Sequence, residues 1–357
     1  MATLEFDQGL FHLEQRNQPV SSTLTPYQQR MVQFCQQYLK GQPEFQLQTS
    51  GSTGTPKSIT ITHGQMQSSA QLTIQTLGLS EGDRLLICLN TDFIGGKMML
   101  VRGMELNAHM KIISPKTNLL EYKPVDFIAL VPLQVYALLA SAEGLQFLES
   151  CSKVIIGGAP LQQRAAQVLG ELSNDVYQTF GMTETVSHFA LKKVSVKKPG
   201  PFKALPEVDL RLDERGCLVV KGPMTDFEEV ITNDLVEFMG EGQFEWIGRF
   251  DEVINSGGYK VYPPKVSQAV EKVLGSMGYD MEFMVFGLPH EDFGQLLALV
   301  MQGPPLVAQQ EEELVKGLRQ QLHTYETPKK LMYLPHFPRT DTGKPCVQAI
   351  KTVLANI

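Results

Sequence analysis

The stretch Thr49–Ser58 (TSGSTGTPKS) gathers glycines, hydroxyl side chains and a lysine in ten consecutive positions. Backbone N–H groups in a glycine-rich turn can surround an anion, and the hydroxyl groups offer further hydrogen-bond donors. Lys57 adds a positive charge near the end of this turn. The stretch therefore predicts a loop that binds phosphate, with a flexible loop in solvent as the alternative.

The nearest general mononucleotide pattern is G-x-x-x-x-G-K-[ST], in which a glycine precedes the lysine. Gly51, Lys57 and Ser58 fit this pattern, but Pro56 stands where that glycine should be. Proline has no backbone N–H to donate and holds φ fixed. A kinase-type loop is therefore disfavoured, and a different phosphate loop is expected.

Five further motifs follow along the chain: IGGAPL at 156–161, FGMTE at 180–184, TND at 232–234, GRFDEVINSGGYKVYP at 248–263 and PRTDTGK at 338–344. In type and order, the six motifs resemble those of the adenylate-forming superfamily, which includes acyl-CoA synthetases, luciferases and nonribosomal adenylation domains. Asn233 departs from the superfamily's T-G-D form. The resemblance extends from about residue 43 to the end of the chain.

The resemblance implies a two-step reaction in which ATP activates a carboxylic acid and CoA then takes the acyl group. Carboxylate and phosphate are both anionic, so catalysis must neutralise charge and align the two groups. The superfamily's nucleotide contacts fall here on Thr49, Ser50, Gly51, Ser52, Thr53, Gly54 and Lys57 for the phosphates, on Gly157, Gly158 and Ala159 for the adenine, on Phe180 and Gly181 of the FGMTE motif, and on Asp234 and Arg249 for the ribose.

The same resemblance implies three catalytic residues. Lys344 would bridge the carboxylate and the α-phosphate, and Thr183 would contact the α-phosphate. Glu184 would bind Mg²⁺, the metal cofactor that the superfamily uses with ATP. Taken alone, Glu184 would be interpreted as a solvated loop acid and Lys344 as a surface charge, so their assignment depends on the motifs around them.

A hinge and a tunnel are implied for the second half-reaction. Asp251 would be the hinge between a domain of residues 1–248 that binds ATP and the acid and a mobile catalytic domain of residues 249–357. Gly257 and Gly258 would line the tunnel for the pantetheine arm of CoA, because glycine permits close approach of a narrow ligand. A simple turn between two strands is the alternative for these glycines.

Three segments would form the wall of the acid-binding pocket: the one after Asn90, residues 131–134, and the one after Glu184. They contribute the candidate pocket residues Phe93, Lys97, Arg102, Gln134 and Ser187. Lys97 or Arg102 could pair with a second carboxylate on the substrate. The alternative is that these cations lie on the solvated face of a helix.

Finer details resemble the o-succinylbenzoate–CoA ligases of menaquinone biosynthesis, namely ALVPLQVYALL at 129–139, KMMLVRG at 97–103, TETVSHFALK at 183–192 and HEDFG at 290–294. This resemblance implies an aromatic dicarboxylic acid as substrate. The alternatives are a ligase for another acyl or aryl acid, an enzyme that loads a carrier protein, a P-loop phosphotransferase, and a non-catalytic nucleotide-binding relic. Retention of Glu184, Asp234, Arg249 and Lys344 disfavours the relic.

Strand-like and helix-like runs alternate between the motifs, which predicts an α/β fold. Buried strands are expected at 85–89, 109–113, 127–131 and 153–157, and helices at 26–40, 98–106, 133–140 and 161–169. Strand-like pieces at 208–212, 217–221, 235–238 and 244–247 predict a small antiparallel β region. A helix from residue 263, strands at 283–287, 296–301 and 330–334 and a helix at 311–323 predict a smaller α+β C-terminal domain.

Bulk composition excludes several classes of protein. The net charge of −7 and the lack of a Lys/Arg-rich block disfavour nucleic acid as a partner. The apolar runs are too short to insert in a membrane, the N-terminus lacks a secretory pattern, and five scattered cysteines favour the cytoplasm. Only 48 residues precede Thr49, fewer than the superfamily usually has, which leaves open how the pocket and a homodimer contact would be completed.

Overall fold

The structure is a computed structural model that describes residues 1–7, 9–13, 23–48, 58–197, 200–339 and 345–355. The chain divides into two compact units. Unit 1 consists of Met1–Thr232 and Glu237–Glu245, and unit 2 consists of Asn233–Val236 and Trp246–Ile357. The predicted boundary at residue 248, with its hinge at Asp251, stays a prediction.

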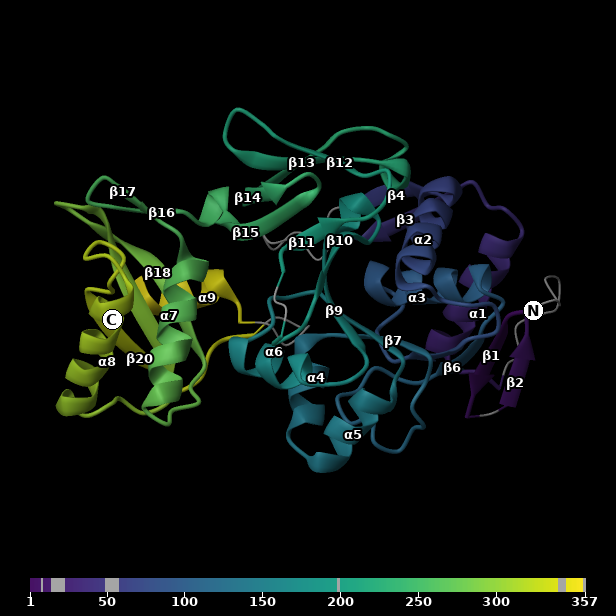
Figure 1. The fold of residues 1–357 in the computed structure, drawn as a ribbon, viewed down its shortest axis with the longest axis horizontal. Coiled ribbons are helices and arrows are strands. Elements are labelled where there is room, and N and C mark those ends of the chain that lie inside the picture. The colour runs from purple at the N-terminus through teal and green to yellow at the C-terminus, as the bar shows by residue number, and fades with distance from the viewer. Residues whose placement is uncertain (8, 14–22, 49–57, 198–199, 340–344, 356–357) are drawn as a thin grey trace. The chain divides into compact units, whose positions relative to one another are not determined.

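A large sheet runs through unit 1 (Figure 1), and residues 233–236 and 246–249 of its strands β14 and β15 belong to unit 2. Its order within the described residues is β12-β13-β14-β15-β11-β10-β9-β8-β7-β5-β6-β1-β2. The strands are β1 (Thr3–Phe6), β2 (Gly9–His12), β5 (Arg84–Ile87), β6 (His109–Ile112), β7 (Phe127–Leu130), β8 (Lys153–Ile156), β9 (Asp175–Gly181), β10 (His188–Lys193), β11 (Phe202–Ala204), β12 (Asp209–Leu212), β13 (Cys217–Lys221), β14 (Val230–Gly240) and β15 (Gln243–Arg249).

The strands from β1 to β9 in this order, β1-β6-β5-β7-β8-β9, pair in parallel. The chain runs from β5 to β6 on one side and then to β7 on the other, so the connections diverge at β5. In open parallel sheets, ligands bind beyond the carboxyl ends of the strands at such a switch point. The ends of β5, β7, β8 and β9 therefore mark the expected place of a site.

Two groups of helices accompany these strands (Figure 1). Helices α4 (Pro132–Leu139), α5 (Ala142–Ser150) and α6 (Gln163–Gly170) share one apolar cluster with β5, β7 and β8. Helices α1 (Pro26–Leu39), α2 (His63–Leu77) and α3 (Ile94–Glu105) form the other group, and a hairpin of β3 (Glu44–Gln48) and β4 (Ser58–Thr62) precedes α2. Thr25 and Thr62 cap α1 and α2 with reciprocal hydrogen bonds to Gln28 and Gln65.

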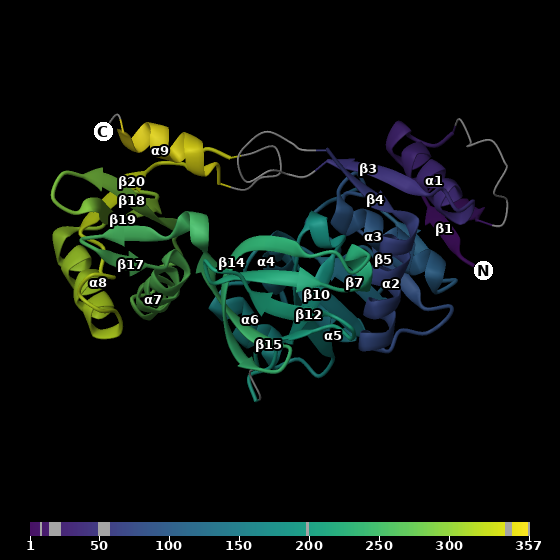
Figure 2. The same cartoon turned by 90° about the horizontal axis from the view of Figure 1, so that it is seen from above.

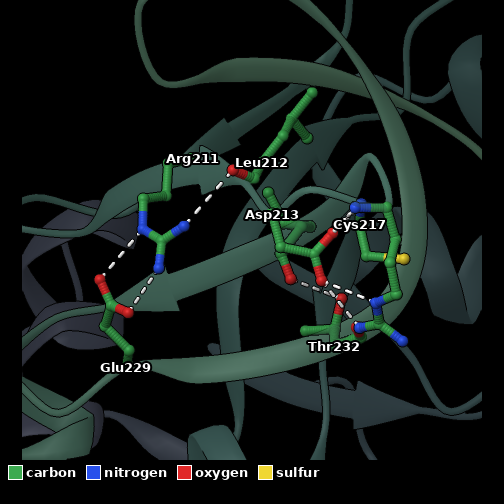
Figure 3. A network of polar contacts seen from close by, with 8 residues as sticks. Arg211, Leu212, Asp213, Cys217, Glu229 and Thr232 are labelled. Carbon is green, nitrogen blue, oxygen red and sulfur yellow. Dashed lines mark hydrogen bonds and ion pairs between the residues drawn. The ribbon is translucent and has the colours of Figure 1, made fainter.

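The antiparallel part of the sheet contains the predicted strands around the turn 213–216 (DERG). Asp213 closes this turn by accepting hydrogen bonds from the backbone N–H groups of Arg215 and Cys217, both at 2.9 Å. Arg211 pairs with Glu229 on the outside of the same strands (Figure 3). The backbone contacts define the turn, whereas an exposed ion pair such as Arg211–Glu229 adds little stability.

Unit 2 is a smaller α+β body. Its sheet has the order β17-β16-β19-β18, and β20 pairs in parallel with β19. The elements are β16 (Ile254–Ser256), β17 (Tyr259–Val261), α7 (Pro263–Ser276), β18 (Phe283–His290), β19 (Gly294–Gln302), α8 (Ala308–Gln321), β20 (Lys330–Leu334) and α9 (Val347–Ala355). Helices α7 and α8 pack on one side of the sheet and α9 on the other (Figure 2).

The predicted fold class is confirmed, but the predicted set of elements was incomplete. Strands β3, β4, β9, β10 and β11 and helices α2, α5 and α9 were not predicted individually. Strands β1 and β2 were not expected, and β14 is longer than the predicted 235–238. Helix α3 begins at Ile94 rather than Met98, although Gly95 and Gly96 lie in its first turn. Gly96 is required there by packing, because a Cβ atom would lie 2.4 Å from the carbonyl oxygen of Asn90.

Gly96→Ala and Gly95→Ala are expected to change stability in opposite directions. The added Cβ of Gly96→Ala would collide with backbone, so the free energy of unfolding should fall by about 1–3 kcal/mol. At Gly95 the added Cβ would make an ordinary 3.9 Å contact with Leu89, and alanine favours a helix by about 0.5–1 kcal/mol. Urea denaturation measures both changes. Similar losses in the two variants would contradict the close approach at Gly96.

Candidate active site

The predicted site residues of unit 1 follow strands that are neighbours in the sheet. Gln134 follows β7, Gly157 follows β8, and Gly181 ends β9. Gly157 has no room for a side chain, since a Cβ atom would lie 2.2 Å from Thr179 Oγ1. Gly158 has φ of +85°, and both it and Ala159 are exposed. The parallel strands thus bring three of the predicted segments to one edge of the sheet.

Phe180 lies in β9 with its ring turned to other aromatic rings. The ring makes edge-to-face contacts with Phe189, Phe202 and Phe244, at centroid distances of 5.6, 5.1 and 5.2 Å. Such contacts hold the ring in place. Because this ring is used in packing, a nucleotide contact at Phe180 would fall to its backbone, and that contact stays a prediction.

A short 3₁₀ turn, η1 (Thr183–Thr185), carries the predicted catalytic pair Thr183 and Glu184. Glu184 is exposed and makes no hydrogen bond or ion pair with the described residues. Mg²⁺ is commonly held by one or two carboxylates together with water and nucleotide phosphates. An open carboxylate at this position fits such a metal. In the described part of the chain, no cluster of three or more His, Cys, Asp or Glu side chains could bind a metal by itself.

A strained turn follows η1. Val186 has φ of 63° and ψ of −45°, and the N–H of Ser187 donates to the carbonyl of Thr185 at 2.6 Å. Positive φ in a β-branched residue costs on the order of 1–3 kcal/mol and persists only where the surroundings hold it. Val186 is buried, with 1% of its surface exposed. The turn places Ser187 beside helix α3, where its Oγ accepts a hydrogen bond from Arg102 Nη2 at 2.8 Å.

Arg102 is a buried cation without a counter-charge among the described residues. It is 1% exposed, and its Nε finds no acceptor in the part of the chain that the structure describes. Burial lowers the pKa of its guanidinium to about 9, so the group stays charged at neutral pH. Burying an unpaired charge is costly. The position is therefore suited to an anionic ligand.

The other candidate pocket residues have different surroundings. The Lys97 Nζ lies 4.6 Å from the centre of the Phe34 ring, and burial lowers the pKa of this amine. Phe93 precedes α3 and is 41% exposed. The side-chain amide of Gln134 donates to the carbonyls of Cys88 and Lys116, at 3.2 and 2.9 Å. Gln134 thus fastens two loops, and its contact with an acid stays a prediction.

Unit 2 brings the predicted ribose residues and the predicted hinge into one cluster. Asp234 Oδ1 accepts a hydrogen bond from Trp246 Nε1 at 3.0 Å and lies 4.0 Å from Arg249 Nη1. Arg249 also donates to both carboxylate oxygens of Asp251, at 3.0 and 3.1 Å. Burial raises the pKa of Asp234, while the Trp246 hydrogen bond and Arg249 oppose that change.

Gly257 and Gly258 form the two-residue turn of the β16–β17 hairpin. Their φ angles are +59° and +83°, and Ser256 faces Tyr259 across the turn. Two positive φ values are what such hairpin turns require. The alternative of a simple turn is therefore present in the structure, and the contact with CoA stays a prediction. The predicted phosphate loop, 49–57, and Lys344 lie outside the described residues.

Two parts of the chain match known protein families, in agreement with the fold and the site residues described above. Residues 39–224 match the AMP-binding enzyme family, and residues 269–344 match the AMP-binding enzyme C-terminal domain. The first match alone spans more than half of the chain. The chain belongs to the AMP-binding enzyme family. Its fold is that of the AMP-forming ligases. This agrees with the predicted fold class, an α/β domain followed by a smaller α+β domain.

Relatives of this AMP-binding enzyme include 2-succinylbenzoate–CoA ligases. The ligase of Bacillus mycoides (strain KBAB4) is 28% identical over 330 residues, which cover 83% of this chain and 67% of that relative. The ligase of Bacillus cereus (strain ATCC 14579) is likewise 28% identical over 329 residues. The chain thus spans about two thirds of the length of these relatives.

Solved structures of AMP-binding enzymes share the fold. An acyl-CoA synthetase (AMP-forming)/AMP-acid ligase II-like protein from Dyadobacter fermentans is 38% identical, with a TM-score of 0.62, and the match covers 95% of this chain and 97% of that one. O-succinylbenzoate coenzyme A synthetase from Bacillus subtilis, solved in complex with ATP and magnesium, is 25% identical with a TM-score of 0.72 over 86% of this chain and 69% of that one.

Within the described residues, no helix has the length and apolar character to cross a bilayer.

Sequence analysis missed Thr73, and it did not single out His188 within the predicted wall segment after Glu184. Thr73 in α2 and His188 at the start of β10 are 0% and 5% exposed. Their side chains contact each other, with His188 Nε2 at 3.1 Å from Thr73 Oγ1. Thr73 and His188 lie too far apart in the sequence for any motif spacing to have indicated that they pair.

Asp234→Asn is expected to stabilise this AMP-binding enzyme and to weaken ATP binding about tenfold, the cost of one hydrogen bond to a charged group. The amide oxygen can still accept the Trp246 hydrogen bond. Since burial raises the pKa of Asp234, its carboxylate opposes folding above that pKa, and the penalty disappears as pH falls towards the ordinary value of 3.8. The gain in unfolding free energy should therefore be larger at about pH 7 than at about pH 4.

Denaturant titration at both pH values measures this gain, and isothermal titration measures ATP affinity. Asp209→Asn is the matched control, because Asp209 is an exposed carboxylate in β12. The control should leave both quantities unchanged. An equal gain for Asp234→Asn at the two pH values would contradict a burial penalty at this carboxylate.

Proposed function

We propose that the protein is an AMP-forming acid–CoA ligase whose acid is o-succinylbenzoate, a step of menaquinone biosynthesis. The observation that carries the choice of acid is Arg102, a fully buried cation with no carboxylate partner among the described residues. O-succinylbenzoate has two carboxylates. One would be activated, and the other would supply the charge that Arg102 lacks. The relatives named 2-succinylbenzoate–CoA ligase, at 28% identity, support this acid.

The first half-reaction joins the acid to AMP. The succinyl carboxylate attacks the α-phosphorus of ATP, a P–O bond to the leaving pyrophosphate breaks, and an acyl-adenylate forms. Lys344 would bridge carboxylate and α-phosphate, Thr183 would contact the same phosphate, and the loop 49–57 would hold the pyrophosphate part. Mg²⁺, held through Glu184, would supply positive charge to the phosphates. Positioning and charge neutralisation provide the catalysis.

The second half-reaction transfers the acyl group to CoA. The CoA thiolate attacks the acyl carbonyl carbon, AMP leaves with the C–O bond pair, and a thioester forms. We assign rotation about Asp251 to the exchange of Lys344 for the CoA arm, which would approach along Gly257 and Gly258. The nucleotide ribose would bind Asp234 and Arg249 throughout.

The candidate pocket residues offer groups that would favour an aromatic dicarboxylic acid over a simpler carboxylic acid. Phe93, exposed before α3, offers a ring to an aromatic acid, and Ser187 lies beside Arg102. The Lys97 amine sits over the Phe34 ring and is the second cation of the same helix. Because Arg102 is buried and Lys97 is half-buried, Arg102 is the stronger candidate for the second carboxylate.

We further infer that the reaction takes place in the cytoplasm. Cys35, Cys88, Cys151 and Cys217 are buried as free thiols, which suits a reducing compartment. The proposed partners are ATP, CoA and the aromatic acid, with neither nucleic acid nor membrane insertion. A homodimer is a further proposed partner state, and light scattering of the purified protein measures whether it forms.

The direct test incubates the protein with ATP, Mg²⁺, CoA and o-succinylbenzoate and identifies the product by mass. The expected result is the o-succinylbenzoyl-CoA thioester together with AMP. Pyrophosphate release without a thioester would instead indicate loading of a carrier protein. A thioester from a different acid in a broad panel would keep the ligase and replace the acid. No AMP with any acid would overturn the enzyme proposal.

A further inference from the structure

Four polar side chains connect α2, α3 and β10 in the interior of unit 1. Arg102 Nη2 lies 2.8 Å from Ser187 Oγ, Ser187 Oγ lies 3.4 Å from His188 Nδ1, and His188 Nε2 lies 3.1 Å from Thr73 Oγ1. The chain of contacts ends at the carbonyl of Ser69, 3.0 Å from Thr73 Oγ1. Arg102, His188 and Thr73 are all more than nine-tenths buried.

The hydrogen positions in this chain follow from its last member. The one hydroxyl hydrogen of Thr73 is directed to the Ser69 carbonyl, so Thr73 Oγ1 can only accept from His188. His188 must then carry its hydrogen on Nε2 and leave Nδ1 as an acceptor. The Ser187 hydroxyl donates to that Nδ1, and its oxygen accepts from Arg102. Each link therefore has one direction.

This arrangement keeps His188 neutral beside a cation. Burial lowers the pKa of His188 well below its ordinary value, and the nearby Arg102 charge lowers it further. Arg102 on α3 is the charged group that faces the ring, and Ser187 and Thr73 are its neutral neighbours. A neutral histidine can accept from Ser187, whereas an imidazolium could not. The chain thus exists only in the neutral form.

We propose that His188 is a positioning residue for the acid substrate, acting through Ser187 to fix the Arg102 guanidinium so that its Nε and remaining N–H groups meet a second carboxylate. This inference rests on the proposed function, because it takes a dicarboxylic acid as the ligand. A guanidinium recognises a carboxylate by two parallel hydrogen bonds, so its plane must be held. Ser187 occupies only one N–H group, and Nε finds no acceptor among the described residues.

The backbone supports the same role. The strained turn at Val186 sets Ser187 and His188 side by side at the start of β10. In an ordinary strand, the side chains of Ser187 and His188 would point to opposite faces, because successive residues of a strand alternate between its two faces. The strain is therefore explained by the pair of contacts that the turn permits.

The test compares two acids that differ in one carboxylate, o-succinylbenzoate and 4-oxo-4-phenylbutanoate. His188→Leu should raise KM for o-succinylbenzoate on the order of tenfold, the effect of losing one well-placed contact to a charged group, with kcat little changed. The monocarboxylic acid should be used as before. His188→Gln, whose amide can donate and accept, should recover most of the loss. Thr73→Val should act in the same direction as His188→Leu, and Thr73→Ser should behave as the wild type.

Equal losses with both acids, or an unchanged preference in His188→Leu, would overturn the positioning role. A second measurement does not depend on turnover: ¹⁵N spectra of labelled histidine should show His188 as the neutral Nε2–H form from about pH 5 to pH 8, the range in which an ordinary histidine titrates. An Nδ1–H form or an imidazolium would overturn the chain even if His188→Leu failed to fold.

The same experiments separate the two proposals. If the wild type makes no o-succinylbenzoyl-CoA but activates another acid, the proposed acid fails and the ¹⁵N spectrum still decides the hydrogen-bond chain. If the wild type uses o-succinylbenzoate and its monocarboxylic analogue equally well, the ligase stands and the positioning role of His188 is overturned.

Discussion

Lys344→Ala is expected to lower the rate of acid adenylation by about 10²–10³-fold, the effect of removing one charge-stabilising donor from a transition state. Thioester formation from a supplied acyl-adenylate should remain largely intact. The reason is that Lys344 is assigned to the first half-reaction, where two anions must be brought together, and is replaced by the CoA arm in the second. Pyrophosphate release measures the first step, and mass analysis of the thioester measures the second.

A matched control is Lys272→Ala, since Lys272 is an exposed lysine of α7. It should leave both half-reactions unchanged and thereby exclude a general effect of lost positive charge. If Lys344→Ala reduced both half-reactions equally, rotation about Asp251 would be the wrong account of this protein. If the rate of neither half-reaction fell in Lys344→Ala, the PRTDTGK motif would not supply the catalytic lysine.

Arg102→Met is expected to stabilise the unliganded protein while lowering kcat/KM for o-succinylbenzoate by about 10²-fold. Replacing a buried ion with an apolar side chain of similar volume is often neutral or stabilising, here by about 1–3 kcal/mol, because the desolvation cost disappears. The loss of activity follows because the second carboxylate would then enter a pocket without a counter-charge. Urea denaturation and steady-state kinetics with both acids measure the two effects.

Lys97→Met is the control from the same helix. It removes a cation whose contact in the structure is the Phe34 ring, so it should cost about 0.5–1 kcal/mol of stability and change the acid preference less. A loss of stability in Arg102→Met, together with equal losses for the dicarboxylic and the monocarboxylic acid, would show that Arg102 serves the fold alone. A larger change of preference in Lys97→Met would move the second carboxylate to Lys97.

Most of the architecture could be predicted because its signals are local. The strands at 85–89, 109–113, 127–131 and 153–157 form where apolar runs predicted them, with ends that differ by at most two residues. Glycine motifs are also local signals, as Gly157 shows by having no space for a side chain. Helix α3 was placed too late for the opposite reason: its glycines suggested a break, and only the packing against Asn90 explains them.

The parts of the fold and of the candidate site that could not be predicted depend on contacts between distant parts of the chain. Thr73 and His188 are separated by 115 positions and meet only because α2 packs near the start of β10. The burial of Arg102 likewise could not be read from KMMLVRG, which is compatible with a solvated helix face. Strand β1 owes its place to parallel pairing with β6, more than a hundred positions along the chain. The motifs could supply candidate site residues, but not the contacts that surround those residues.

The single tryptophan of the protein, Trp246, donates its indole N–H to Asp234, the residue assigned to the ribose. An indole reports changes of charge and hydrogen bonding at its ring through its emission, and no other tryptophan in this chain dilutes the signal. The fold has therefore placed a native optical probe one hydrogen bond from the residue proposed to bind the nucleotide ribose. Occupancy of that position can be followed in the unlabelled protein, separately from the chemistry at the acid.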